Sequence, residues 1–323
     1  MTEPVAGVAP AGGDAPRSEP ATTAAHRAVV DDLLGWGAPR PRVADDFADR
    51  LRARLEEGLA TVAGGLDDRL WLSKSALQAL ACDGRWLDRR DGTFTPSVAL
   101  VAGRITHRAA ELDAATGRSR DVDELLDRAV REIASDPTSS EADLLNGLDA
   151  LEAADLRATC RDRLVEWRLL WPDLDRVEVS FEHGLRAQFA DGRVVLSGRP
   201  DLVVRSPRPR PGRATDLVVD LKSGQRNEVR DRADLRLYGV LWTLKYRRPP
   251  FRWASFYLAE GRWDAEDFSE PLLLGAADRV VDAARRAARL TSPVPEDELQ
   301  LVPGAHCRFC GRRETCPVGP ATW

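Results

Sequence analysis

Apolar residues recur at three- and four-residue spacing through most of the first half of the chain. The segment VADDFADRLRARLEEGLATVA shows this spacing, as do later segments up to about residue 170, and the spacing is typical of amphipathic helices. The segment WLSKSALQALACDGRWL supplies a serine that suits the N-cap of such a helix. The first 25 residues are small and rich in proline and glycine, which predicts a disordered tail.

Near residue 176 the pattern changes to alternation and β-branched runs, which predict three or four strands up to TDLVVDLKSG. A helix over EVRDRADLRLYGVLWTLKY, a hairpin over RWASFYLAEGRWDAEDF and a long amphipathic helix over PLLLGAADRVVDAARRAARL are expected to follow. We therefore predict a mixed α/β fold in four segments. They are a tail over 1–25, a helical domain over 26–175, a core with a mixed central sheet over 176–270, and a C-terminal helix with a cysteine cluster over 271–323.

The composition is that of a globular protein, with 43% apolar and 31% charged residues in a chain of 323. No apolar run reaches the roughly eighteen residues of a membrane span. The first residues do not have the charged-then-apolar order of a secretory signal, so we expect a cytoplasmic protein. The net charge of −5 does not indicate a nucleic-acid binder. Arginine clusters such as RSPRPRPGR fit either a local basic face or ordinary solvated surface.

Lysine is rare in this arginine-rich chain, and one of its three lysines, Lys222, stands two residues after Asp220 in VVDLKSG. Side chains at i and i+2 of a strand share a face, so Asp220 and Lys222 are expected side by side, with the Leu221 carbonyl free to face the same site. If the strand GRPDLVV pairs with this one, Asp201 adds a second carboxylate. Such oxygen ligands suit Mg²⁺ or Mn²⁺. Taken alone, however, a D-x-K triplet is more often a solvated surface pair.

The GRPD and DLK segments together resemble the PD-(D/E)XK nuclease superfamily, and in particular its RecB-like (CRISPR-associated or AddB-type) arm. The resemblance implies a restriction-endonuclease-like core in which Asp201, Asp220 and Lys222 form a metal-dependent phosphodiesterase site. In GRITHRAAE the Gly-x-x-x-His spacing matches the helix that carries the metal-binding histidine of that family. His107 therefore inherits this role, and the Leu221 carbonyl completes the implied ligand set. A plain helical surface histidine is the competing interpretation.

In DLRLYGVLW, Tyr238 falls where the family's Gln-x-x-x-Tyr motif places its tyrosine, which implies a contact with DNA. The motif glutamine is replaced by Asp234. An aspartate there is expected to repel phosphate unless Arg230 or Arg236 pairs with it. Glu178 or Glu182, on the first predicted strand, is a further possible site carboxylate, and surface charge is the alternative.

Five cysteines in a chain without an export signal favour metal ligation or plain burial over disulfides. Cys307, Cys310 and Cys316 have the spacing C-x₂-C-x₅-C and can converge on one metal centre. Candidates for a fourth ligand are Cys82, Cys160 and His306. Cys82 ends a serine-x-serine helix that resembles RecB-like nucleases with an iron–sulfur cluster. This resemblance implies a [4Fe–4S] staple on Cys82, Cys307, Cys310 and Cys316, with a structural Zn²⁺ as the rival; Cys160 is expected to be an ordinary buried thiol.

The resemblance implies a Mg²⁺- or Mn²⁺-dependent deoxyribonuclease, with exonuclease action favoured over endonuclease action, on single-stranded DNA or frayed ends. No phosphate-binding Gly-x-x-x-x-Gly-Lys-Ser/Thr loop occurs, so a motor is not expected. The nuclease then works alone or with a helicase, CRISPR or defence partner, in DNA repair, CRISPR adaptation or phage defence. Two alternatives stay open: a non-cleaving DNA-binding clamp with a degenerate nuclease fold, and an RNA-directed nuclease.

Overall fold

The computed structural model describes most of the chain. The described residues are 31–35, 38–92, 95–171, 177–206, 210–224 and 226–319. The predicted disordered tail over 1–25 lies outside them. Within this part of the chain, no helix has the length and apolar character that crossing a membrane requires.

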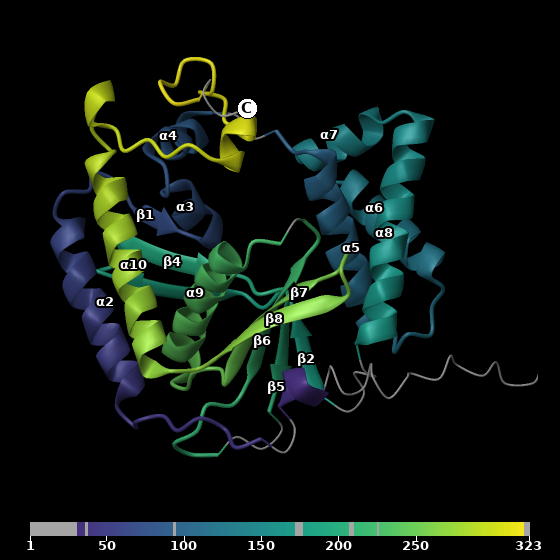
Figure 1. Cartoon of the computed structure of the whole chain (residues 1–323), viewed down its shortest axis with the longest axis horizontal. Coiled ribbons are helices and arrows are strands. Elements are labelled where there is room, and N and C mark those ends of the chain that lie inside the picture. The colour runs from purple at the N-terminus through teal and green to yellow at the C-terminus, as the bar shows by residue number, and fades with distance from the viewer. Residues whose placement is uncertain are drawn as a thin grey trace, which may run out of the picture.

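Two mixed sheets form the centre of the molecule (Figure 1). The larger has the strand order β2-β5-β6-β7-β8, and the smaller has the order β1-β4-β3. β6 pairs antiparallel with β5 and parallel with β7, while β1 pairs parallel with β4. The strands are β1 (Leu70–Leu72), β2 (Glu178–Phe181), β3 (Leu185–Phe189), β4 (Val194–Gly198), β5 (Leu202–Arg205), β6 (Leu217–Lys222), β7 (Arg252–Tyr257) and β8 (Arg262–Asp267).

Two groups of helices flank these sheets (Figure 1). α9 packs against strands of both sheets, and α2 and α10 pack against α9 and against each other. A second group, α5 to α8, forms a separate bundle on the opposite side of the view. The helices are α2 (Phe47–Ala63), α3 (Lys74–Ala79), α4 (Asp83–Asp91), α5 (Val98–Ala115), α6 (Val122–Ala134), α7 (Ser140–Gly147), α8 (Ala150–Leu170), α9 (Glu228–Tyr246) and α10 (Glu270–Arg289).

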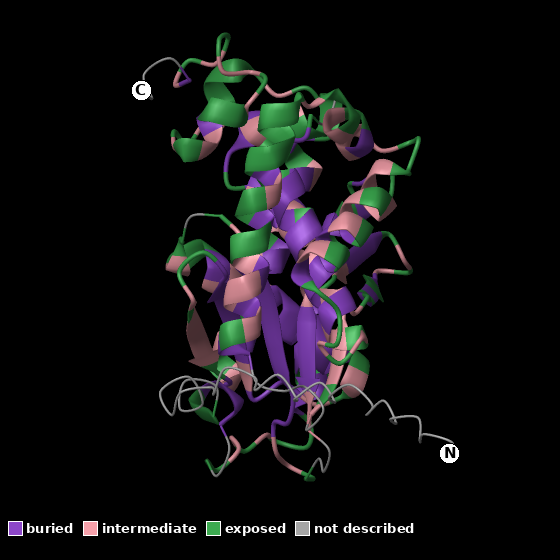
Figure 2. Ribbon diagram, turned by 90° about the vertical axis from the view of Figure 1, so that its right-hand side faces the viewer, coloured by how far each residue is buried: buried purple, intermediate pink, exposed green. Residues whose placement is uncertain are grey.

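Burial explains the sequence pattern of these elements. β6 is buried along almost its whole length, because it is the middle strand of the larger sheet and α9 packs against it. Figure 2 shows that the strands at the centre of the molecule are largely buried. β3 alternates buried and exposed residues, as expected of a strand with one solvated face. The polar α6 face is exposed, whereas α9 buries ten side chains and a glycine around its circumference between sheet and helices. α9 is therefore a central helix of the core.

The predicted mixed α/β class is confirmed, with two differences. Among the described residues, five strands, β2 to β6, lie between residues 176 and 222, where three or four were predicted. The other difference is in the N-terminal half. The segment WLSKSALQALACDGRWL was expected to begin a helix, but Trp71 and Leu72 belong to β1, which extends the smaller sheet. The expected serine cap is present, since the Ser73 hydroxyl accepts a hydrogen bond from the Ala76 amide at 3.2 Å. The helix then ends before Cys82, and α4 begins after it. β1 is only three residues long, too short for alternation to reveal it.

Candidate active site

Asp201 and Leu221 meet where β5 begins and β6 ends. Asp201 immediately precedes β5, and its Oδ2 accepts a hydrogen bond from the Leu221 backbone amide at 2.7 Å. The amide and carbonyl of a strand residue point to the same edge, so the Leu221 carbonyl also lies on the Asp201 side of β6. The neighbouring Lys222 carbonyl points the other way, where it accepts from the Leu258 amide at 2.9 Å. The Asp201 carboxylate and the Leu221 carbonyl thus share one edge.

Asp220 is buried between two lysines. Lys222 Nζ lies 2.6 Å from Asp220 Oδ2, and Lys74 Nζ, from α3, lies 2.7 Å from Oδ1. Burial alone would raise the pKa of Asp220, but the two ammonium groups outweigh it and hold the pKa well below its usual range. For both lysines, burial opposes protonation, yet the Asp220 charge raises their pKa values. This carboxylate is therefore ionised and compensated by two cations.

His107 reaches the same strand ends from α5. Its Nδ1 lies 3.5 Å from Asp201 Oδ1, and burial of the imidazole is outweighed by Asp201, so the pKa of His107 is raised. Its Nε2 is buried and has no hydrogen-bond partner among the described residues. α5 approaches closely because Gly103 leaves room: a Cβ there would lie 2.6 Å from Ser223 Oγ, just after β6.

Glu182 joins His107 and Asp201, whereas Glu178 does not. Ligand atoms of His107, Glu182 and Asp201 all lie within 4.8 Å of one another. Glu182 follows β2 with a φ of +48°, a left-handed conformation that is uncommon for residues other than glycine. Glu178, at the other end of β2, lies 3.9 Å from Arg205 instead. The two carboxylates considered from the sequence are thus separated by the length of one strand.

A second buried network lies behind Lys222. Its Nζ lies 3.4 Å from Asp231 and 4.0 Å from Asp234, both on α9. Asp234 accepts a hydrogen bond from the Gln78 amide at 2.5 Å. Burial raises the pKa of Asp234, with Lys222 partly offsetting the effect. The expected pairing of Asp234 with an arginine is not seen among the described residues: Arg236 pairs with Glu266, and Arg230 lies next to Asp231. Asp234 instead contacts the Gln78 side-chain amide from α3 and the Lys222 ammonium, because it faces the core whereas the arginines face outward.

Tyr238 is buried one helical turn beyond Asp234. The Lys74 ammonium lies 5.3 Å from the centre of its ring, and burial raises the pKa of its hydroxyl. Gly198, which begins the GRPD segment, permits this placement, because a Cβ there would lie 2.8 Å from the Tyr238 ring. The tyrosine therefore packs under the same site as Asp220.

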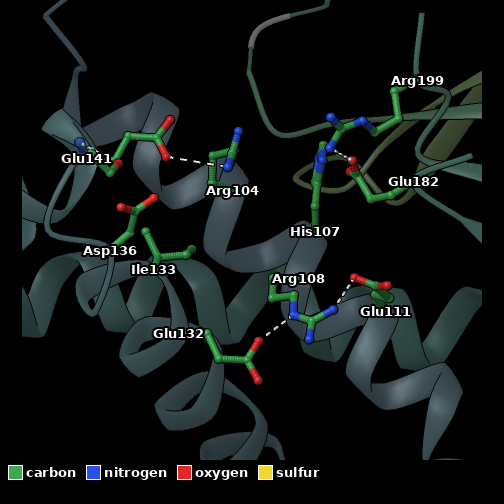
Figure 3. Close-up of a pocket in the computed structure, with 11 residues that line it drawn as sticks. Arg104, His107, Arg108, Glu111, Glu132, Ile133, Asp136, Glu141, Glu182 and Arg199 are labelled. Carbon is green, nitrogen blue, oxygen red and sulfur yellow. Dashed lines mark hydrogen bonds and ion pairs between the residues drawn. The ribbon is translucent and has the colours of Figure 1, made fainter. Parts of the chain in front are cut away.

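A cleft opens from His107 toward α6 and α7 (Figure 3). Arg199 and Arg104 line it; Arg199 lies 3.1 Å from Glu182, and Arg104 lies 3.6 Å from Glu141. Both arginine side chains are more than half exposed. Of the metal-ligand candidates, His107 and Glu182 line this cleft, whose charged lining consists of three arginines and five carboxylates.

The donor set suits a hard divalent cation. It combines carboxylate oxygens, a strand carbonyl and a buried imidazole nitrogen that lacks a hydrogen-bond partner among the described residues. Oxygen-rich sites with one imidazole are compatible with Mg²⁺ or Mn²⁺. An ammonium beside such an ion stabilises developing negative charge on phosphate. The residues that could hold the metal are His107, Asp201 and Glu182, whose ligand atoms lie within 4.8 Å of one another, and the Leu221 carbonyl; the predicted ligand Asp220 lies outside that close group.

The four cysteines of the predicted staple line one small cavity, although they come from opposite ends of the chain. Cys82 precedes α4, and Cys307, Cys310 and Cys316 lie in the C-terminal segment. His306 lines the same cavity, whereas Cys160 is buried elsewhere and contacts the Ala102 carbonyl at 3.5 Å. The Val302 amide donates to Cys82 Sγ at 3.5 Å. Among the described residues, the one group of three ligand atoms within 4.8 Å contains no cysteine.

Sequence reasoning did not assign roles to Lys74 and Gln78. They lie one turn apart on α3, so both side chains face the site; the sequence pattern of this helix pointed only to Cys82. A signal existed for Lys74, since lysine is rare in this chain and Lys74 precedes a short apolar helix. No local sequence motif connects Lys74 with Asp220 or Gln78 with Asp234, because both contacts depend on the pairing of β1 with β4.

Comparisons with known proteins agree with this geometry. The family model of the PD-(D/E)XK nuclease superfamily matches residues 72–317, most of the chain. A solved structure titled "Crystal structure of SSO0001" is similar at 14% sequence identity, over 83% of this chain and 94% of that one, with a TM-score of 0.31. At that TM-score the likeness adds no argument about the fold. The search of curated proteins found no match.

Proposed function

The chain belongs to the PD-(D/E)XK nuclease superfamily, and from this membership we propose that it is a metal-dependent deoxyribonuclease of the RecB-like type. The observation that carries the proposal is the convergence of His107 and Asp201 beside the Asp220–Lys222 pair at one end of the sheet. Three elements far apart in sequence meet there. Stability alone gives no reason to gather so many buried charges, since burying ions is costly.

In the proposed mechanism, His107, Asp201, Asp220 and the Leu221 carbonyl hold one Mg²⁺ or Mn²⁺. Such an ion would supply positive charge that polarises the phosphodiester and lowers the pKa of the attacking water. Lys222, held by Asp220 at 2.6 Å, positions that water or compensates the charge that develops on phosphorus. Hydrolysis leaves 5′-phosphate ends. Glu182 and Arg199 line the approach to this centre (Figure 3).

We further propose that the substrate is single-stranded DNA or a frayed DNA end, which favours exonuclease action. The cleft beside His107 has three arginines and five carboxylates in its lining, and its exposed Arg104 and Arg199 would meet backbone phosphates by exchanging their present partners, Glu141 and Glu182. Tyr238 is buried beside Lys74, so the contact with DNA that the resemblance implies would require the site to open around its ring. A cellular role in DNA repair, CRISPR adaptation or phage defence, alone or with a helicase or defence partner, follows from the RecB-like assignment.

The cofactor that we propose for the four cysteines is a [4Fe–4S] cluster. Cys82, Cys307, Cys310 and Cys316 line one small cavity although they come from distant parts of the chain. Four thiolates suit either an iron–sulfur cluster or a structural Zn²⁺. The RecB-like assignment favours the cluster. Such a cluster would join α4 to the C-terminal segment across more than two hundred residues of chain.

The decisive experiment compares wild type with Lys222→Ala on end-labelled single-stranded DNA in Mn²⁺, with EDTA as the metal-free control. Cleavage by the wild type that stops in EDTA and in the variant supports the proposal. Tight binding without cleavage by the wild type would instead support the non-cleaving clamp. Competition by unlabelled RNA tests the RNA-directed alternative.

A further inference from the structure

Lys74 occupies a position that the proposed metal must share. Its ammonium lies 2.7 Å from Asp220 Oδ1, while Lys222 lies 2.6 Å from Oδ2, so both oxygens of this carboxylate are engaged by cations. A divalent ion bound by Asp220 requires one of these oxygens. Because two ammonium groups beside this carboxylate repel a divalent cation, we expect one of the two lysines to withdraw when the ion binds.

The contacts identify Lys74 as the lysine that withdraws. Lys222 is held in addition by Asp231 at 3.4 Å and by Asp234 at 4.0 Å, and its side chain is 16% exposed. Lys74 has Asp220 as its one ion-pair partner among the described residues, and its side chain is 29% exposed. Its neighbour is the Tyr238 ring, 5.3 Å away, an aromatic face that can hold a displaced ammonium.

The local structure gives no other reason for a lysine at this position. Lys74 is the first residue of α3, where the helix dipole disfavours a cation. Its location is set by β1, which pairs with β4 and directs the chain from Leu72 through the Ser73 cap to the sheet end. A residue that is locally unfavourable but precisely directed at a buried carboxylate points to a role in the site.

We propose that Lys74 is a substrate-binding residue that competes with the divalent metal for Asp220 and, once displaced, contacts a backbone phosphate of the nucleic acid. This inference rests on the proposed function. Before the metal binds, Lys74 neutralises Asp220. Afterwards its ammonium is free to meet an anionic group, and its side chain, 29% exposed, is the more accessible of the two lysine side chains. The ligand that it then meets is a phosphodiester oxygen.

The test uses Lys74→Met, which keeps most of the side-chain length and removes the charge. Lys245→Met is the matched control, because Lys245 is the third lysine and binds the Gly184 carbonyl at 2.9 Å, away from Asp220. Calorimetric titration with Mn²⁺ alone, without nucleic acid, should show about tenfold tighter binding for Lys74→Met, as expected when one charge-assisted hydrogen bond stops competing. Lys245→Met should match wild type.

The second readout is the salt dependence of KM for labelled single-stranded DNA in Mn²⁺. Loss of one phosphate contact should raise KM and reduce the slope of log KM against log salt by about 0.7. Lys74→Arg retains the cation and should keep the wild-type slope, while its guanidinium, a better partner for carboxylate, should weaken Mn²⁺ binding. This variant decides the question if Lys74→Met does not fold.

The outcomes separate the two proposals. Unchanged or weaker Mn²⁺ binding by Lys74→Met, with normal cleavage by the wild type, overturns the role of Lys74 and leaves the nuclease assignment standing. Tighter Mn²⁺ binding by Lys74→Arg overturns it as well. A wild type that neither binds Mn²⁺ nor cleaves DNA overturns both.

Discussion

Asp201 Oδ2 accepts a hydrogen bond from the Leu221 backbone amide at 2.7 Å, twenty residues further along the chain. The bond continues the pairing of β5 with β6 beyond the last ladder pair, so one oxygen of this carboxylate has a structural role. The other oxygen lies 3.5 Å from His107 Nδ1. One aspartate thus joins the two strands and also faces the proposed metal.

Replacing Asp201 with asparagine should separate these two roles. The amide oxygen can still accept from Leu221, so the free energy of unfolding should change by less than about 1 kcal/mol. The negative charge toward the metal is lost, and cleavage in Mn²⁺ should fall by at least about 100-fold, which corresponds to roughly 2.7 kcal/mol of barrier. Thermal unfolding and cleavage rates measured on the same preparation check both statements. A variant that stays fully active would remove Asp201 from the ligand set.

The sequence could supply the parts of this site that have a local pattern. Asp220 and Lys222 two residues apart on an apolar strand predict a shared face, and the structure has them in contact. The contact of Lys74 with Asp220 could not be predicted in this way, because it spans 146 residues and depends on a three-residue strand. The partners of Asp234 were also missed, since burial, rather than spacing along the helix, decides that Gln78 and not an arginine reaches it.

Asp83 should be important for stability without taking part in chemistry. It directly follows Cys82, is fully buried, and pairs with Arg286 and Arg289 of α10 while accepting from the Gln300 amide at 2.8 Å. Asp83→Asn leaves two arginines without their anion and should destabilise the fold by about 3 kcal/mol. Urea unfolding at neutral pH measures the change.

The same carboxylate predicts an acid sensitivity. Burial alone would raise the pKa of Asp83, but the Gln300 amide and the two arginines outweigh it and hold the pKa below its usual value. The stability that Asp83 contributes to the fold is therefore complete above its unfolded pKa, near pH 4, and is lost as the pH falls through its lowered pKa in the folded protein. The stability gap between wild type and Asp83→Asn should narrow below about pH 4.

Asp91→Asn is the matched control, because Asp91 ends the same helix. Asp91 pairs with the adjacent Arg90, but its side chain is 55% exposed. An exposed pair contributes about 0–1 kcal/mol, so this variant should unfold close to wild type. Equal losses in both variants would contradict the role given to Asp83.

The cysteine cavity makes a spectroscopic prediction. Anaerobically purified wild type should contain iron and sulfide and show a broad absorption band near ~400 nm, as thiolate-ligated clusters do. Cys310→Ser should lose the iron and the band and should unfold at a lower temperature. Cys160→Ser is the control, because Cys160 lies outside the cavity, and it should keep the full spectrum. A colourless protein that contains one equivalent of zinc would show that the four cysteines hold a structural Zn²⁺ instead of a cluster.

Asp234→Asn should stabilise the protein. The Asp234 carboxylate is buried, and one of its oxygens, Oδ1, has no hydrogen-bond partner among the described residues. Asparagine keeps an acceptor for the Gln78 amide and removes a buried charge whose attraction to Lys222 acts over 4.0 Å. Burial raises the pKa of Asp234 in the folded protein. The folded protein therefore loses stability as the pH rises from the unfolded pKa through this raised value, because the buried carboxyl must then ionise. The variant should therefore gain about 1 kcal/mol over wild type at neutral pH and less near pH 4. Urea unfolding at both pH values measures this gain, and a variant less stable than wild type at neutral pH would show that the ion pair with Lys222 outweighs the cost of burial.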